Sequence, residues 1–311
     1  MSTGGTAIPV IDISGAASLD AASEQIDAAC RGIGFFAVTG HRVAGELLEG
    51  VLTVTREFFA QPLAHKNSLA IESSDHHRGY AGVEGELLEP GLRADYKETM
   101  DFGPEIPLGD PRRSPLEGPN QWPDLPGFRA AVEAYQEAVL DAAKRLLRLI
   151  AQALELEPSF FDERFGRPLV GTRLIRYPTV SEPLPDQLGC GAHSDYGCIT
   201  LLLTDGAPGL QLADIDRRWH DVVAPADSFI INLGDMLARW TNDRYRATVH
   251  RVQSPRTADR YSVPTFVNPS YDTVVECLPG CLGEGEQPKY PPTTSGAYLQ
   301  SRFDETFAYR Q

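Results

Sequence analysis

The first half of the chain carries apolar residues mainly at helical spacing. Across 19–29 and 43–60 these residues recur every three or four positions, which predicts two amphipathic helices. Ser18 is placed to begin the first helix and Gly32 to end it. The same period runs through 127–156, where it predicts one long amphipathic helix or two shorter helices in tandem.

Short β-branched runs separated by turn residues take over after Pro158. Segments 8–12 and 33–40 already have the pattern of strands near the start of the chain. The later runs share a length of five to eight residues and a regular spacing, and they are 172–177, 198–204, 210–214, 228–233, 248–253, 261–268 and 272–277. Many short strands at regular spacing predict a β-sandwich or a jelly roll. Segment 295–309 returns to helical spacing.

Glycine, proline and charged residues dominate the stretch 70–126, which predicts loops and short strands. Long loops of this kind often line binding sites. The expected fold class is α+β but mainly β, with N-terminal helices, a double-stranded β-helix (jelly roll) core and a C-terminal helix. We expect a helical and loop-rich region over 1–125, followed by the long helix and the jelly roll over 126–311, packed as one compact unit.

Composition and charge narrow the choice of partner. Hydrophobic residues make up 42% and charged residues 23% of the 311 residues, so the chain can bury a full core. The net charge of -15 leaves no positive field for a phosphate backbone. We therefore expect neither nucleic acid nor an anionic membrane as a partner, and instead expect a small soluble molecule.

Cysteine spacing and hydropathy bear on the compartment. The five cysteines show no CxxC spacing, which indicates neither a disulfide framework nor a zinc knuckle and favours a reducing cytoplasm. No stretch approaches 18 uninterrupted apolar residues, and no basic segment followed by an apolar run opens the chain, so we expect no membrane span and no export signal. No heptad pattern indicates an oligomeric state.

His193 and Asp195 stand two positions apart in a stretch expected to be a strand, where both side chains would point to one face. His250 lies in another strand-like run and supplies a second imidazole. Two imidazoles and a carboxylate on one face of an octahedron leave three open positions, which suits ferrous iron that must bind oxygen. Zinc is the rival metal, but catalytic zinc with this ligand set usually appears as HExxH, a motif absent here.

The His-x-Asp pair is weak evidence by itself. With seven histidines and 43 acidic residues among 311, such a pair is expected roughly once by chance. Arg260 and Ser262 follow His250 and share one strand face, where guanidinium and hydroxyl together can hold a carboxylate. Such a clamp indicates a dicarboxylate co-substrate, and Tyr177 offers a phenolic hydroxyl to the same group. The conjunction of these residues indicates an oxygen-activating metalloenzyme.

Longer stretches around these residues resemble a known family. The chain is similar to the isopenicillin N synthase-like superfamily of iron(II)- and 2-oxoglutarate-dependent oxygenases in the stretches GAHSDYGCITLLLTD, FIINLGDMLARWTND, ATVHRV and RYSVPTFVNPS. The similarity extends to PVIDIS, GFFAVTGH and REFFAQPLAHK near the start and to PKYPPTTSGAYL near the end, so it covers nearly the whole chain. Within the superfamily the chain resembles the thymine hydroxylase group, including an arginine at position 173, but the substrate is not carried over.

The resemblance implies the jelly roll independently of the strand pattern, and it implies an enzyme. It assigns three iron(II) ligands, His193, Asp195 and His250, and three contacts to 2-oxoglutarate, Arg260, Ser262 and Tyr177. The implied activity is a dioxygenase that oxidises a small metabolite with O2 and releases succinate and CO2. Hydroxylation is the default outcome, while desaturation and ring closure stay open.

Candidate substrate contacts lie beside the clamp and in the loop-rich stretch. Arg173 shares a strand face with Tyr177, so it is placed to meet an anionic or carbonyl group of a substrate, although a structural salt bridge explains it equally well. His76 and His77 lie among charged residues and are expected to be solvated. Apolar pocket walls are expected from four side chains, Tyr80, Met100, Phe102 and Phe266.

Three other functions remain open at this point. An iron oxidase of the same superfamily that needs no 2-oxoglutarate would use the clamp for a carboxylate of its substrate. A catalytically inactive jelly-roll binding module would keep the fold without turnover, but all three ligand positions are filled. A zinc hydrolase would work without oxygen, but no GxSxG nucleophile motif supports hydrolysis.

Overall fold

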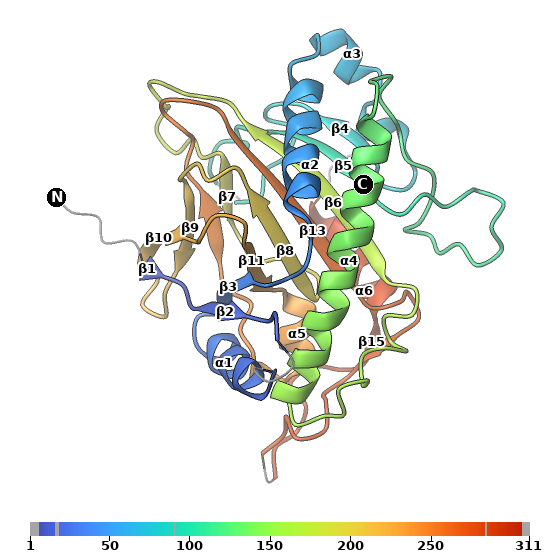
Figure 1. The fold of residues 1–311 in the computed structure, drawn as a ribbon, viewed down its shortest axis with the longest axis vertical. Coiled ribbons are helices and arrows are strands. Elements are labelled where there is room, and N and C mark those ends of the chain that lie inside the picture. Colours follow the sequence, from blue (N-terminus) through green and yellow to red (C-terminus); the bar gives the residue numbers. More distant parts are fainter. Residues whose placement is uncertain (1–5, 16–18, 90, 284, 307–311) are drawn as a thin grey trace.

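Two β-sheets packed face to face form the core of the molecule, which the computed structural model describes over residues 6–15, 19–89, 91–283 and 285–306 (Figure 1). The larger sheet has eight strands in the order β2 (Val10–Asp12), β3 (Phe35–Thr39), β11 (Phe229–Leu233), β8 (Ile199–Thr204), β13 (Arg260–Asn268), β6 (Leu169–Tyr177), β5 (Glu98–Phe102) and β4 (Gly79–Ala81). The smaller sheet has five strands in the order β1 (Thr6–Ala7), β10 (Trp219–Val223), β9 (Leu210–Ala213), β12 (His250–Val252) and β7 (Cys190–His193). This arrangement is the expected jelly roll, and a short hairpin of β14 (Val274–Val275) and β15 (Thr293–Thr294) lies outside it.

Strand β6 shows how the sequence separates the two faces of the larger sheet. Ile175 and Tyr177 belong to the apolar cluster between the sheets, whereas Leu174 belongs to the cluster on the opposite face. Successive side chains of a strand point to opposite faces, so every second residue of β6 faces the smaller sheet. Arg173 therefore shares the inner face with Tyr177, as its spacing predicts.

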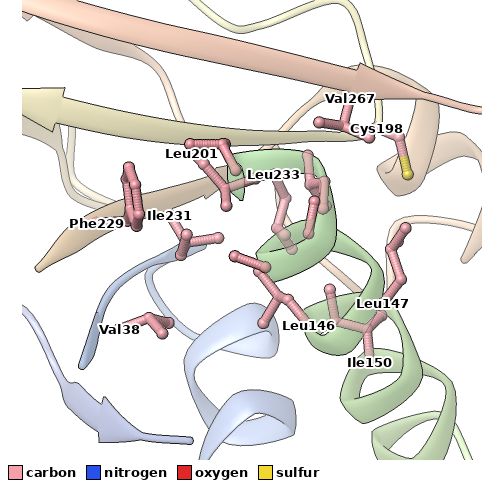
Figure 2. Close-up of a cluster of buried hydrophobic side chains, with 14 of the residues drawn as sticks. Val38, Leu146, Leu147, Ile150, Cys198, Leu201, Phe229, Ile231, Leu233 and Val267 are labelled. Atoms are coloured by element: carbon pink, nitrogen blue, oxygen red, sulfur yellow. The ribbon is translucent and has the colours of Figure 1, made fainter. Parts of the chain in front are cut away.

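Helices cover the outer face of the larger sheet (Figure 1). On this face lie α2 (Gly45–Phe59) and α4 (Phe128–Ala153), and α1 (Leu19–Arg31) packs against α4. The other helical segments are α3 (Leu63–Asn67), the short 3-10 helix η2 (Ile71–Ser73), α5 (Asp235–Trp240) and α6 (Ser295–Thr306). Figure 2 shows Leu146 and Ile150 of α4 directed toward Ile231 and Leu233 of β11, with Leu201 of β8 beside them. The amphipathic face of α4 thus packs on the centre of the sheet.

Most elements agree with the predicted pattern. The stretch 127–156 forms one helix, α4, rather than two, and each of the seven runs after Pro158 contains a strand. The first helix ends at Arg31, just before Gly32, while its predicted start at Ser18 lies outside the described residues. Strand β10 was not predicted, because its residues alternate poorly between buried and exposed positions. The division of the chain at 125/126 stays a prediction.

The predictions drawn from hydropathy and from cysteine spacing can each be compared with the structure. No helix among the described residues is long and apolar enough to cross a membrane. All five cysteines are free thiols, and four of them are buried. The five free thiols agree with the expectation, drawn from the spacing, that these cysteines form no disulfide framework.

Replacing Leu146 tests the contact between α4 and the sheet. Leu146→Ala removes a side chain buried in this interface and leaves a cavity, so we expect the free energy of unfolding to fall by about 2–5 kcal/mol. Urea denaturation followed by circular dichroism measures the change. Lys144→Ala on the exposed side of α4, where the ammonium pairs with Asp141 in solvent, is expected to stay within about 0.5 kcal/mol of the parent. Equal midpoints for both variants would contradict the packing.

Candidate active site

Three side chains meet where β7 and β12 lie next to each other at one edge of the smaller sheet. Strand register sets His250 directly opposite His193, and their ring centroids are 4.4 Å apart. The Oδ1 atom of Asp195 lies 3.8 Å from Nε2 of each histidine. One ligand atom from each residue falls within 4.8 Å of the other two, so all three can reach one metal ion.

Main-chain carbonyls fix how both imidazoles present their nitrogens. Nδ1 of His193 lies 2.8 Å from the carbonyl oxygen of Gly191, and Nδ1 of His250 lies 3.1 Å from that of Thr248. A carbonyl oxygen only accepts, so each Nδ1 carries the proton and donates it. The lone pair of each Nε2 is then free to bind a metal. A hydrogen bond from the other ring nitrogen to a carbonyl is the usual support of a metal-binding histidine.

Asp195 is held in a similar way. Its Oδ2 accepts hydrogen bonds from the hydroxyl of Thr200 and from Nδ2 of Asn232, at 2.6 Å for the amide, which leaves Oδ1 facing the imidazoles. Burial raises the pKa of Asp195, but His250 and His193 together with these two donors hold it below its usual value. Burial, followed by His193, lowers the pKa of His250 to about 4. A carboxylate beside neutral imidazoles is the state that binds a divalent cation.

The local backbone differs from the expected one in one respect. Strand β7 ends at His193, so Asp195 lies just beyond the strand rather than two positions along it. The turn after β7 carries the carboxylate back toward the histidine, because the main chain of the same turn accepts the N–H of Asp235 at the start of α5. The strand premise was wrong for Asp195, although the predicted meeting of the three side chains is what the structure shows.

A cavity of about 80 Å³ lies between the sheets, and the three side chains line one part of it. Arg260, Ser262 and Tyr177 line the same cavity. Nη1 of Arg260 lies 3.4 Å from the Ser262 hydroxyl, and the guanidinium lies 4.9 Å from the centre of the Tyr177 ring. The structure thus brings together all six residues predicted for the metal and the co-substrate.

Arg260 is a buried cation, and no described carboxylate pairs with it. It is 1% exposed, and its recorded hydrogen bonds go to the Ala207 carbonyl and the Ser262 hydroxyl, both at 3.4 Å. No acidic side chain within the described ranges forms an ion pair with it. Buried charges are normally paired, so the position calls for an anionic ligand in the cavity.

A second cavity, of about 150 Å³, adjoins the first and shares His193 and Asp195 with it. Three predicted substrate contacts, Arg173, Phe102 and Phe266, line its wall. Tyr80 and Met100 lie elsewhere, in the core beneath the helices, where the Tyr80 hydroxyl donates to Glu98 at 2.6 Å. Both side chains are buried, and neither lines the cavity.

His77 is buried and His76 is half-buried, which corrects the expectation that both are solvated. Both line the larger cavity, and His77 is buried, with its ring stacked on that of Phe303 at 5.0 Å. Phe303 belongs to α6, and Leu299 of the same helix also lines the cavity. Neighbouring charges in the sequence misled the expectation, because packing of α6 against this loop could not be read from local polarity.

Residues that the sequence reasoning missed form a buried charged cluster beside both cavities. Lys97 is bound by Glu86 at 2.9 Å and by Asp95 at 2.6 Å, and Glu86 also lies 2.9 Å from Arg173. Asp101 accepts from Nε of Arg173 at 2.7 Å. A signal was present in the sequence: Asp95, Lys97 and Asp101 fall at odd positions of one strand-like run, which places polar groups on one face.

The same loop supports the metal strand. The main-chain N–H of Gly191 donates to Asp95 at 2.9 Å, and that of Ala192 donates to Glu89 at 2.8 Å. A Cβ atom at Gly191 would lie 2.9 Å from the Cβ of Glu89, so only glycine admits the loop this closely. Side chains of the loop therefore accept the hydrogen bonds of the main-chain N–H groups at the outer edge of β7. No further strand lies beside this edge within the described sheet.

Known proteins are similar in sequence to nearly the whole chain. The family model described as "non-haem dioxygenase in morphine synthesis N-terminal" matches residues 8–125, and that of the 2OG-Fe(II) oxygenase superfamily matches residues 170–269. The 2-oxoglutarate-Fe(II) type oxidoreductase hxnY of Emericella nidulans is 37% identical, covering 98% of this chain and 93% of the relative. A homoarginine-6-hydroxylase of Arabidopsis thaliana is 34% identical and covers 92% of this chain and 89% of its own.

Solved structures agree with these relatives. A full-length Neurospora crassa protein in complex with alpha-KG and thymine superimposes with a TM-score of 0.86 at 27% identity, covering 98% of both chains. A 2OG-Fe(II) oxygenase family protein from Caulobacter crescentus gives 0.87 at 28% identity, covering 97% of this chain and 99% of that one. Fold and site together define an iron(II)- and 2-oxoglutarate-dependent dioxygenase, which uses O2 and acts on a small molecule. The chain belongs to the 2OG-Fe(II) oxygenase superfamily.

Removing one hydrogen bond to Asp195 tests how the carboxylate is oriented. Thr200→Val keeps the side-chain volume but deletes the hydroxyl that donates to Oδ2, so we expect affinity for Fe(II) to fall by about 10-fold or more. Anaerobic calorimetric titration with Fe(II) measures the loss. Ser228→Ala, which deletes a hydroxyl bonded to the Pro225 carbonyl outside both cavities, should leave the affinity unchanged. Equal affinities for the two variants would show that Thr200 does not orient the ligand.

Proposed function

We propose that His193, Asp195 and His250 hold one ferrous iron and that the protein hydroxylates a small molecule bound in the 150 Å³ cavity. Two Nε2 atoms and one carboxylate oxygen converge without a fourth protein ligand among the described residues, which suits a metal with open positions. Iron bound there would take up 2-oxoglutarate and O2 and supply the oxidation of the substrate, with succinate and CO2 as co-products. His193 and Asp195 line both cavities, so the metal position borders substrate and co-substrate alike.

The observation that carries the proposal is the charge of Arg260, which has no acidic partner in the described part of the chain. Arg260 and Ser262 stand across from Tyr177 and Ile175 in adjacent strands, and together with Tyr177 they line the end of a cavity whose other part holds the three candidate ligands. We assign these residues to the far carboxylate of 2-oxoglutarate, which would neutralise the arginine. The near end of the same co-substrate would then reach the metal.

Residues of the chain also exclude water and orient the reactants. Apolar side chains of both sheets surround the smaller cavity, among them Ile175, Leu202 and Leu210. A dry site strengthens each charged hydrogen bond made inside it. Phe102 and Phe266 give the substrate cavity its apolar walls, so the part of the substrate nearest the metal is selected by shape.

An oxidase that works without 2-oxoglutarate is the second candidate. It would use Arg260 to bind a carboxylate of its own substrate. Curated relatives named as 2-oxoglutarate-dependent enzymes support the first candidate, and so does the small size of the cavity around Arg260. Oxygen consumption with and without 2-oxoglutarate separates the two.

Substitution of Arg260 tests the assigned role. Arg260→Gln removes the buried cation that faces the co-substrate, so we expect KM for 2-oxoglutarate to rise by about 30-fold or more with a smaller change in kcat. Succinate formation at varied 2-oxoglutarate measures both constants. Arg167→Gln, which removes a cation paired with Glu117 outside both cavities, serves as the matched control. A change confined to kcat, or the same change in both variants, would contradict the assignment.

Loss of the metal tests the activity itself. The wild-type protein, loaded with Fe(II) and 2-oxoglutarate without oxygen, should develop the visible charge-transfer absorption of the iron–keto acid pair. His193→Ala should lose this absorption and the oxygen-dependent release of succinate, because one of three ligands is gone. A variant that keeps full activity, or a wild type that binds no Fe(II), would refute the proposed function.

A further inference from the structure

Arg173 lies in the wall shared by the two cavities, and two buried carboxylates already neutralise its charge. Its Nε donates to Oδ1 of Asp101 at 2.7 Å, and its Nη1 lies 2.9 Å from Oε1 of Glu86. Arg260 has no such partner among the described residues. We propose, resting on the proposed function, that the substrate is a neutral amide-type molecule, which offers a carbonyl oxygen rather than a carboxylate to Arg173.

Each cation of the charged cluster around Arg173 is already paired with carboxylates. Glu86 is shared between Arg173 and Lys97, and Lys97 also binds Asp95. The third hydrogen-bond partner of the Lys97 ammonium is the Cys190 sulfur, at 3.3 Å. An ammonium group has three protons, so Lys97 has no donor free for a ligand. Arg78 also acts on Asp101, so three cations face three carboxylates and an anion placed beside them would find no free positive charge.

Arg173 still has one donor to offer. Its Nη2 takes part in no hydrogen bond or ion pair within the described part of the chain, whereas Nε and Nη1 are used. Beside it, Oδ2 of Asp101 accepts, from the residues that the structure describes, a single long hydrogen bond of 3.4 Å from the Thr99 hydroxyl. A donor next to an acceptor matches the carbonyl and the N–H of an amide, a lactam or a ureide. A carboxylate would bring its negative charge against Asp101.

Arg78, which also lines the larger cavity, is balanced by Asp101, because its charge opposes the rise in the pKa of Asp101 that burial causes. Nη1 of Arg78 donates to the carbonyls of His76 and His77, and Nη2 donates to that of Leu116. Burial, and then Arg113, lowers the pKa of His76, which favours its neutral form. The ring of His77 is stacked on Phe303. Arg173 is therefore the basic group that shares a wall with the co-substrate cavity, and its charge is already neutralised.

Glu86 becomes a specificity-determining residue in this arrangement, although it acts through Arg173. Its side chain is 6% exposed, and it lines neither cavity in the described residues, so its effect on a ligand is electrostatic. Removing its charge would leave Arg173 with Asp101 alone. The cavity would then accept an anion more readily.

Paired ligands test this inference on the holoenzyme. The protein loaded with Fe(II) and 2-oxoglutarate under argon is titrated with benzamide and benzoate, with isonicotinamide and isonicotinate, and with nicotinamide and nicotinate, none of which can chelate the iron through a ring nitrogen and a carboxylate together. Saturation-transfer NMR and the change in the iron–2-oxoglutarate absorption report binding. We expect the neutral member of a pair to bind about 10-fold or more tightly than its carboxylate partner, which is about 1.4 kcal/mol.

Substitution at Glu86 provides the second arm. Glu86→Gln keeps the shape of the side chain and should reduce the neutral-to-anionic ratio by about 10-fold. Glu117→Gln is the matched control, because Glu117 is a buried carboxylate paired with Arg167 outside both cavities, and it should leave the ratio unchanged. Asp101→Asn should shift the ratio in the same direction as Glu86→Gln. The ratio measured on the wild-type protein tests the inference even if neither variant folds.

Three results would overturn the inference: tighter binding of the carboxylates by the wild type, no binding of any neutral member, or an equal ratio in a folded Glu86→Gln protein and its control. Failure of the proposed function is recognised separately. In that case the iron–2-oxoglutarate absorption would not form before any ligand is added. An absorption that forms normally, followed by a preference for carboxylates, would leave the function standing and refute only the substrate class.

Discussion

The antiparallel pairing of β7 with β12 sets His193 directly opposite His250, and the site depends on this register. A slip by one residue would turn one imidazole to the other face of the sheet, because side chains alternate along a strand. The turn after β7 then needs only to bring Asp195 back by a few ångströms. The placement of the metal-binding side chains therefore depends on backbone pairing. The hydrogen bonds to the imidazoles and to Asp195 then fix how each side chain is oriented.

Two arginines on adjacent strands, one buried and one largely enclosed, show how one scaffold prepares two different subsites. Arg260 on β13 lacks an acidic partner among the described residues, while Arg173 on β6 has two. The same guanidinium group is therefore a charged anchor in one place and a neutralised hydrogen-bond donor in the other. The difference lies in β5 and the loop before it, which supply the carboxylates to only one of the arginines.

The jelly roll was predictable from strand periodicity. The meeting of the six residues assigned to metal and co-substrate was predictable chiefly from the resemblance to the oxygenase superfamily, because the pairing of β7 with β12 joins residues that lie far apart in the sequence. Asp195 came to the right place by a different local path, since a turn rather than a strand carries it. The positions of His77 and Phe303 were not predictable, because α6 reaches the cavity from the far end of the chain. Burial of Tyr80 and Met100 in the helical core depends on which face of β4 and β5 the helices cover, and local sequence does not record this.

The acidic loop before β5 has a consequence for how copies of the molecule meet. Strand β7 is the last strand of its sheet within the described residues, and such an edge can pair with an edge of another chain. Here the carboxylates of Asp95 and Glu89 already accept the outward amide hydrogens of Gly191 and Ala192. A loop that supports the metal strand therefore also keeps it from serving as a template for intermolecular sheets, at the one edge where unwanted pairing would disrupt the metal centre.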